Sequence, residues 1–327
     1  MSEWTCQVLQ LLDRFTVADL LEKRLQTLVT LRAEQSPAEA MRTLLEKEIT
    51  SAPIVEREGS QPLGFLDIRR LLKRVMKKKE VLRETTGATM RALARHAPYR
   101  PVKLSASVAT AAAVLGTGVH RVPVIDDESG DVVGIISQID IVTFLFKHLD
   151  ELPEEGNAAA VLNSQVMQGS CGTSPVAYAP RDMSAESAFN LLGNKQLASV
   201  PIVDQTGTMV GKISAHDVER FLLGDFSAEQ LQQNIVDYLH SLHDGDVIPD
   251  HASDNLVSDE GTTVRDCIIK MARARRHHLF VVGAGTQMPL RVVSVGDLVR
   301  TLTKHNDWKL AELRALSFFD AEEAEQA

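Results

Sequence analysis

Apolar residues recur along the chain in a pattern of helix, strand, strand and helix that occurs four times. The first short strand of each unit is apolar and follows a polar or basic residue, at 50–55, 119–126, 198–203 and 277–282. Apolar residues at helical spacing precede it, and a second apolar strand follows a polar turn. The equivalent positions 53, 123, 201 and 280 lie 70, 78 and 79 residues apart. This spacing predicts four copies of one structural unit.

One unit of about 50 residues, with two helices and two or three strands, is too small to bury its own sheet. The sequence therefore predicts that the units associate in two pairs within a mixed α/β (α+β) fold. The polar segment 150–165 is interpreted as the connector between the pairs. The predicted boundaries are 10–150 for the first pair (repeats at about 28–75 and 101–149), 165–306 for the second pair (repeats at about 176–224 and 256–305) and 307–327 for a C-terminal segment.

Helix starts carry recognisable capping residues. Ser36-Pro37-Ala38-Glu39 has a capping hydroxyl, a proline in the first turn and a glutamate at the third position, which predicts a helix N-terminus. Ser184 and Thr262 hold comparable places in the third and fourth repeats. A capping box at 227–230 predicts an extra helix over 227–244, between these two repeats.

Three repeats end their second strand with serine, followed by aspartate three residues later. These pairs are Ser137 and Asp140, Ser214 and Asp217, and Ser294 and Asp297. A helix N-terminus and a hydroxyl suit a phosphate, and a carboxylate one turn later can accept both hydroxyls of a ribose. The same two residues can instead cap the closing helix. Their recurrence in three repeats favours a ligand-binding role.

Repeat one departs from this pattern, with Asp67 in place of the serine and Arg70 in place of the aspartate. A guanidinium group only donates hydrogen bonds, so Arg70 cannot accept ribose hydroxyls. A carboxylate at 67 would repel a phosphate. The sequence therefore predicts that repeat one does not bind a nucleotide in this way.

Basic residues precede the first strand in two of the repeats. His120 and Arg121 stand there in repeat two, and Arg276, His277 and His278 stand there in repeat four. Repeats one and three have only Thr50-Ser51 and Ala198-Ser199. A single histidine beside a strand is more often structural or solvated, but two basic clusters at equivalent positions favour binding of an anion.

Composition limits the function further. The chain has 327 residues, a formal charge of −9 and 44% hydrophobic residues, which argues against general nucleic-acid binding and allows buried cores. No apolar run reaches the roughly 18 to 20 residues of a membrane helix, and no basic-then-apolar leader opens the chain. Cys6, Cys171 and Cys267 are widely spaced and indicate a reducing compartment without a metal cluster. We expect a protein of the cytoplasm, with the nucleus as a second compartment, that contacts no membrane.

Two segments allow two interpretations each. The basic run 69–79 is interpreted as a solvated helix face, with docking of an acidic partner or contact with phosphates as the alternatives. The apolar positions of 308–319 are interpreted as packing on the domain, with a partner interface as the alternative.

The four units resemble cystathionine-β-synthase (CBS) motifs, most clearly in Tyr99-Arg100-Pro101-Val102, in 119–126 and in 134–140. Two tandem pairs of such motifs (two Bateman modules) resemble the gamma regulatory subunit of AMP-activated protein kinase. The resemblance covers about residues 10 to 306 and implies a flat, pseudo-symmetric disk.

The resemblance also implies roles for individual residues. It places a ribose at Asp140, Asp217 and Asp297, and phosphate near Ser137, Ser214 and Ser294. It places His120, Arg121 and His277 at phosphates in the centre of the disk. His278 replaces a second family arginine there, and Thr173 matches a threonine that touches a nucleotide.

The resulting hypothesis is an energy-sensing regulatory subunit that binds AMP, ADP or ATP and assembles with the catalytic and beta-type scaffold subunits of a protein kinase. Motifs for phosphoryl transfer, metal-dependent hydrolysis or a nucleophile elbow do not occur, so we expect no enzyme activity, no catalytic cofactor and no metal. The alternative is a freestanding CBS protein that modulates another target and binds another adenosyl ligand, such as S-adenosylmethionine, or none.

Overall fold

The four repeats form four copies of one three-stranded sheet. The computed structural model describes residues 6–21, 28–47, 49, 51–57, 60, 62–77, 87–95, 101–218, 229–242 and 257–304. Side chains 69, 70, 74, 75, 77, 87–89, 95 and 216 also lie outside this description. The predicted C-terminal segment 307–327, the capping residues 227 and 228, and most of the basic run therefore lie outside the described part of the chain.

Each sheet has a short strand that pairs in parallel with a central strand, which pairs antiparallel with a third. The central strand shifts register before its last residue in every sheet. This shared irregularity identifies the four units as equivalent. The strands are β1 (Leu31–Arg32), β2 (Ser51–Val55) and β3 (Pro62–Asp67); β4 (Val102–Lys103), β5 (Arg121–Ile125) and β6 (Val132–Ser137); β7 (Ala179–Pro180), β8 (Ser199–Val203) and β9 (Met209–Ser214); and β10 (Val257–Ser258), β11 (His278–Val282) and β12 (Pro289–Ser294).

Helices flank every sheet, and their starts follow the capping residues with one exception. Ser36 and Glu39 form the predicted capping box of α3, and the Ser184 hydroxyl caps α9. The prediction of Thr262 as the equivalent cap is wrong by one residue, because the Thr263 hydroxyl caps α12 and Thr262 is buried against Ser258. The helices are α1 (Gln7–Leu12), α2 (Val17–Leu21), α3 (Pro37–Glu46), α4 (Ile68–Lys77), α5 (Gly87–Arg95), α6 (Val108–Gly116), α7 (Gln138–Lys147), α8 (Asn157–Leu162), α9 (Ala185–Lys195), α11 (Ile235–Leu242), α12 (Val264–Ala274) and α13 (Val295–Thr303), with 3-10 turns η2 (Leu149–Glu151), η3 (Ala215–Val218) and η4 (Gln230–Gln232).

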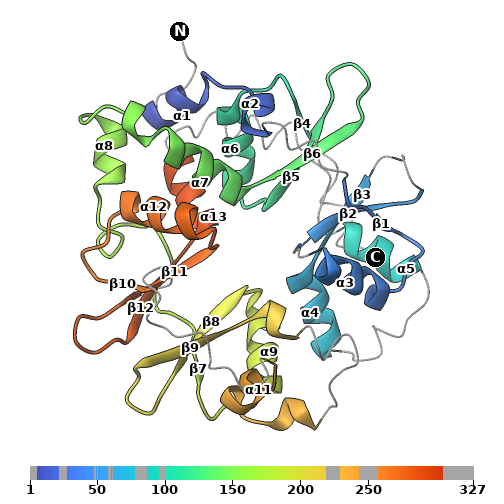
Figure 1. Ribbon diagram of the computed structural model, residues 1–327, viewed down its shortest axis with the longest axis vertical. Helices are drawn as coiled ribbons and strands as arrows, with labels where there is room; N and C mark the ends of the chain where they lie inside the picture. Colours follow the sequence, from blue (N-terminus) through green and yellow to red (C-terminus); the bar gives the residue numbers. More distant parts are fainter. Residues whose placement is uncertain are drawn as a thin grey trace, which may run out of the picture.

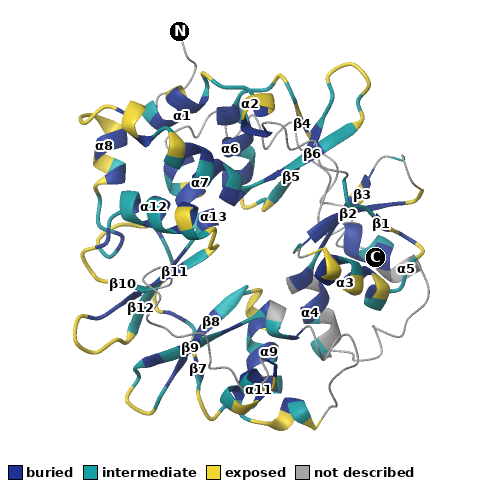
Figure 2. Cartoon of the chain, viewed as in Figure 1, coloured by how far each residue is buried: buried dark blue, intermediate teal, exposed yellow. Residues whose placement is uncertain are grey.

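Two large buried clusters hold the repeats together through their helices (Figure 2). One cluster joins repeat two, through α6 and α7, to α12 and α13 of repeat four, and α1 and α2 pack on it. The other joins α4 of repeat one to α9 of repeat three. Each cluster thus takes one repeat from each of the two predicted pairs.

Repeats three and four also meet through their sheets. Met209, Phe280 and Val282 form a third buried cluster, and the Met209 backbone N–H donates to the Gln287 carbonyl at 3.0 Å. This sheet contact joins the two repeats of the second predicted pair. The division of the chain at 10–150 and 165–306 stays a prediction, because the two large helix clusters join repeats across the predicted pairs.

The four sheets are arranged around the middle of the molecule with their hairpins directed outward, and helices pack between the sheets of repeats two and four and of repeats one and three (Figure 1). The predicted mixed α/β fold of four repeats in a pseudo-symmetric disk is confirmed. Within the residues described, no helix combines the length and the apolar character that crossing a membrane requires.

Helices α1, α2, α5 and α8 were not predicted, and the last two add side chains to the buried clusters. Helix α5 packs on β2 and β3 and contributes Met90, Leu93 and Ala94 to the cluster of repeats one and three. All five residues of β2 are consequently buried. Helix α8 lies within the segment predicted as a polar connector, where Ala158, Ala159 and Leu162 are buried. Both helices carry apolar residues at helical spacing, which is the signal that could have identified them.

The helices of different repeats approach very closely at two glycines. A Cβ atom on Gly116 of α6 would lie 2.3 Å from Oγ1 of Thr303 on α13. A Cβ atom on Gly193 of α9 would lie 3.2 Å from the Cα atom of Lys73 on α4. A side chain at Gly116 would therefore force a neighbour to move, and one at Gly193 would make a tighter contact than is usual.

We expect Gly116→Ala to destabilise the fold by about 1–3 kcal/mol, because the buried Thr303 side chain has no space to move. Thr303→Ala removes the clashing hydroxyl, so the double variant should recover most of that loss. Urea unfolding of the two single variants and the double variant would measure this coupling. Additive effects of the two substitutions would contradict the close contact.

Candidate functional site

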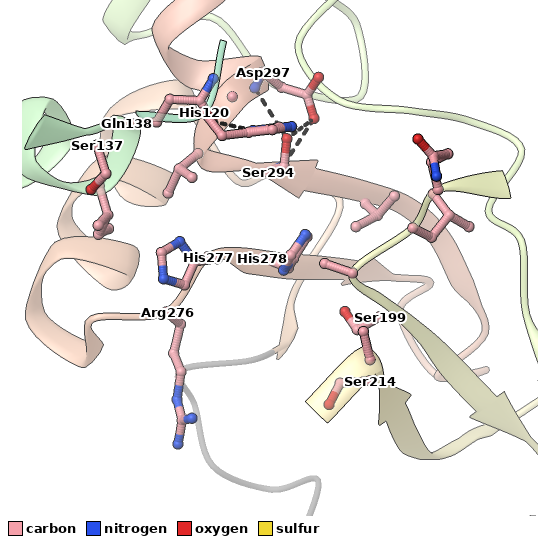
Figure 3. A pocket seen from close by; sticks show the side chains of 18 of the residues that line it. His120, Ser137, Gln138, Ser199, Ser214, Arg276, His277, His278, Ser294 and Asp297 are labelled. Atoms are coloured by element: carbon pink, nitrogen blue, oxygen red, sulfur yellow. Dashed lines mark hydrogen bonds between the residues drawn. The ribbon is translucent and has the colours of Figure 1, made fainter. Parts of the chain in front are cut away.

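A cavity of about 550 Å³ lies where the four repeats meet (Figure 3). Repeat one contributes Asp67 and Ile68, and the connector before repeat three contributes Thr173. The other three repeats contribute the ends of their strands and the starts of their closing helices. The cavity is therefore shared by all four repeats.

Strand register brings equivalent residues to the cavity. The first residue of each central strand pairs with the last residue of the third strand, as Arg121 does with Ser137. Figure 3 shows Ser199 and Ser214 of repeat three beside His277 and His278 of repeat four. In the other three sheets the same register pairs Ser51 with Asp67, Ser199 with Ser214, and His278 with Ser294.

Within each of the three serine–aspartate pairs, the aspartate is hydrogen-bonded to its serine. Oδ2 of each aspartate accepts from the backbone N–H and the hydroxyl of its serine. In repeat four these distances are 2.9 and 2.7 Å, and the Asp297 N–H donates back to the Ser294 hydroxyl at 3.1 Å. Each pair is therefore a cap at the start of the closing helix or turn, which is the alternative that the sequence left open.

Capping occupies only part of each carboxylate. The second oxygen of Asp297, Oδ1, accepts from Arg300 at 3.1 Å. The Asp297 side chain is 15% exposed and lines the cavity. Asp140 and Asp217 are half-buried and do not line this cavity. The predicted ribose role of the three aspartates stays a prediction.

All but one of the other predicted site residues lie at the cavity. They are His120, Arg121, Ser137, Thr173, Ser214, His277, His278, Ser294 and the non-binding Asp67. The backbone of Arg70 lies in α4, but its side chain lies outside the described residues.

The cavity is basic although the whole chain is acidic. Its lining includes four arginine and lysine side chains, and the carboxylates of Asp67 and Asp297 offset part of their positive charge. His120, His277 and His278 can add further positive charge when protonated. Side chains of like charge repel one another, so this arrangement is stabilised by a bound anion. The four cations are Arg121, Lys212, Arg275 and Arg276.

Gln138 orients the imidazole of His120. Its Nε2 donates to the carbonyls of Leu115 and Val119, both at 3.1 Å, so its Oε1 faces Nδ1 of His120 at 3.2 Å. Nδ1 of His120 therefore carries a hydrogen. Nε2 of His120 can donate to a phosphate oxygen only when the ring is protonated. Sequence reasoning missed Gln138; its signal is a polar residue where the other repeats have Ile68, Ala215 and Val295.

Lys212 is the second residue that sequence reasoning missed. It pairs with Pro201 in the sheet of repeat three, at the position that Phe65, Ile135 and Val292 hold in the other repeats. Burial and, to a smaller extent, the charge of Arg276 lower the pKa of the Lys212 amine, while Asp217 acts in the opposite direction. A lysine at an otherwise apolar strand position is the signal that could have identified it.

The cysteines are buried thiols and do not form part of this site. Burial raises the pKa of Cys171 to about 11 and that of Cys267 to about 12, which makes both poor nucleophiles. In the described part of the chain, no group of three or more His, Cys, Asp or Glu side chains could hold a metal ion.

The CBS domain family model matches residues 17–77, 94–147 and 169–224, which together are slightly more than half of the chain. These ranges contain the sheets of repeats one, two and three. Residues 257–304 lie beyond the matched ranges but form the same three-stranded sheet with the same register.

Curated relatives carry the name Sds23. Protein SDS23 of Eremothecium gossypii is 26% identical over an alignment of 219 residues, and the match covers 59% of this chain and 44% of that protein. Protein sds23 of Aspergillus clavatus is 28% identical over an alignment of 199 residues, and the match covers 59% of this chain and 37% of that protein. The chain thus matches less than half of the length of either relative.

A solved structure shares the arrangement of all four repeats. Protein MJ1225 from Methanocaldococcus jannaschii, which has been put forward as an archaeal homolog of g-AMPK, is similar with a TM-score of 0.66. The similarity covers 87% of this chain and 99% of that protein, at 14% identity. At this identity the similarity shows the fold alone.

We expect Lys212→Met to raise the melting temperature of the ligand-free protein at pH 7. The pKa of this amine is lower in the folded than in the unfolded state, where it is 10.5, so folding costs free energy while the amine is charged. The cost is full below the folded pKa and decreases as the pH rises toward 10.5, so the gain should be smaller at about pH 10. Lys103→Met, at an exposed strand position, is the control. A variant less stable than the wild type at pH 7 would contradict this account.

Proposed function

The chain belongs to the CBS domain family, and from this premise we propose that it is a non-catalytic regulatory protein that binds adenine nucleotides in its central cavity. The observation that carries the proposal is the concentration of cations and histidines in one cavity of an acidic protein. A neutral ligand would not need this charge. Nucleotide phosphates would neutralise it.

The phosphates would lie at the centre and the nucleosides toward the edges of the cavity. His120 and Arg121 line the cavity from repeat two, and His277 and His278 line it from repeat four, so these four would hold the phosphates. The ribose hydroxyls would bind the carboxylates of Asp140, Asp217 or Asp297, which lie one helical turn from the serines at the cavity wall. Repeat one has Asp67 at the wall and would bind no phosphate.

Regulation would follow from the position of the cavity. Its lining comes from all four repeats, so a nucleotide would favour the arrangement of repeats that contacts it best. A partner that binds one arrangement more tightly than another would then respond to the nucleotide. We propose as partners the catalytic and beta-type scaffold subunits of a protein kinase, with AMP, ADP or ATP as the signal.

A specific observation favours a second candidate. The relatives are named Sds23, and the chain matches less than half of their length. The alternative is therefore a CBS protein that acts outside a kinase complex and modulates another target, with another adenosyl ligand or none.

A matched pair of variants separates ligand binding from helix capping. Asp297 and Asp266 complete equivalent capping boxes at the starts of α13 and α12 in repeat four, but only Asp297 lies at the cavity. Asp297→Asn and Asp266→Asn should each cost about 0.5–1.5 kcal/mol of stability, because each weakens a capping hydrogen bond. Only Asp297→Asn should weaken nucleotide binding, by roughly 1–3 kcal/mol, because a charged acceptor of the ribose is lost.

Calorimetric titration with AMP, ADP, ATP and S-adenosylmethionine, together with urea unfolding, would measure both effects. We expect submillimolar binding of at least one adenine nucleotide to the wild type. Equal nucleotide affinity of the two variants would reduce Asp297 to a helix cap. Tighter binding of S-adenosylmethionine than of any nucleotide would favour the second candidate.

The proposed partners need a separate test. The purified protein, immobilised, should retain purified kinase catalytic and beta-type subunits, and the retained amount should change when ATP is exchanged for AMP. Absence of retention, with nucleotide binding intact, would exclude the kinase complex and leave the second candidate.

A further inference from the structure

Repeat three lacks the basic residues that repeats two and four carry before their central strands. At that position it has Ala198 and Ser199. It has instead a cation one strand further on, at Lys212 of β9. The equivalent positions in the other three repeats are Phe65, Ile135 and Val292. A charge in place of an apolar residue is unfavourable in a strand of this kind unless it binds something.

Lys212 lies in the cavity wall with a second cation. Along β9 the half-buried residues Val210, Lys212 and Ser214 alternate with buried ones, so these three share a face. Lys212 and Ser214 line the cavity, together with Arg276 from repeat four. Arg276 is close enough to disfavour the charged form of Lys212, so the two cations repel each other across the contact between the repeats.

The nearby carboxylate does not form an ion pair with this lysine. Asp217 attracts Lys212, but its Oδ2 accepts from the backbone N–H and the hydroxyl of Ser214 at 2.6 and 2.8 Å. Within the described residues, Lys212 makes no ion pair with Asp217 or with any other carboxylate. Two neighbouring cations and a hydroxyl, without a carboxylate bound to the lysine, are the arrangement that a phosphate group completes.

We propose that Lys212 and Arg276 form the phosphate-binding subsite of repeat three, which holds the phosphates of a nucleotide whose ribose lies at Asp217. This inference rests on the proposed function, since it assigns a subsite within the same cavity. The cation that repeats two and four supply before the first strand comes in repeat three from the second strand and from the neighbouring repeat. The triphosphate of ATP carries more negative charge than the phosphate of AMP to neutralise the two cations, so this subsite favours ATP over AMP.

The test compares wild type, Lys212→Met, Lys212→Arg and the control Lys103→Met. Each is titrated calorimetrically with AMP, ATP and inorganic pyrophosphate at one pH and one salt concentration, after a thermal melt that confirms folding. Lys212→Met should weaken ATP and pyrophosphate binding about tenfold or more, and AMP binding less. Lys212→Arg should keep most of the affinity, and Lys103→Met should bind like the wild type.

A second comparison assigns the subsite to repeat three. If Asp217 and Lys212 hold one nucleotide, the double variant Asp217→Asn, Lys212→Met should bind one ATP fewer per chain than the wild type. Each single variant should show the same loss at low ATP concentration. Equal ATP and pyrophosphate affinity of Lys212→Met and the wild type would overturn the inference. Failure of the wild type to bind any adenine nucleotide would instead overturn the proposed function. In that case, pyrophosphate binding that depends on Lys212 would still support the anion subsite, and its absence would refute it.

Discussion

Apolar contact between helices of different repeats is the interaction on which the rest of the structure depends. A single repeat exposes one face of its helices, and only another repeat covers it. Helix α6 meets α13 at Gly116, and α4 meets α9 at Gly193, so the same close approach is made twice. These two contacts bind repeat two to repeat four and repeat one to repeat three. The sheet contact of repeats three and four then connects the two halves.

This packing determines where charge collects. The helices of different repeats pack against one another, and strand ends of all four repeats border one cavity, where the repeats present equivalent positions. A substitution at one of these positions in one repeat therefore changes a cavity that all four repeats share. Asp67, Ser137, Ser214 and Ser294 are the four versions of one such position. The excess of cations there costs stability in the absence of a ligand, which is a common property of binding sites.

The repeats, their strands and the basic residues that precede the central strands of repeats two and four could be predicted from the sequence, because each depends on a local pattern. Arg121 and His278 begin a central strand, and the period of a strand decides which way they face. Which repeats share a buried cluster could not be predicted, since every helix offers a similar apolar face. Helix α5 was missed because it lies between repeats and has no equivalent in them. The sequence could not separate helix capping from ribose binding at Asp297, because one carboxylate supplies the atoms for both.

The central claim is that the cavity between the four repeats holds the phosphates of adenine nucleotides. A crystal structure of the protein grown with ATP tests it most directly. We predict a nucleotide with its phosphates among His120, Lys212 and His277 and its ribose at one of the three aspartates. A cavity without nucleotide at millimolar ATP, or a nucleotide bound elsewhere on the molecule, would contradict the account.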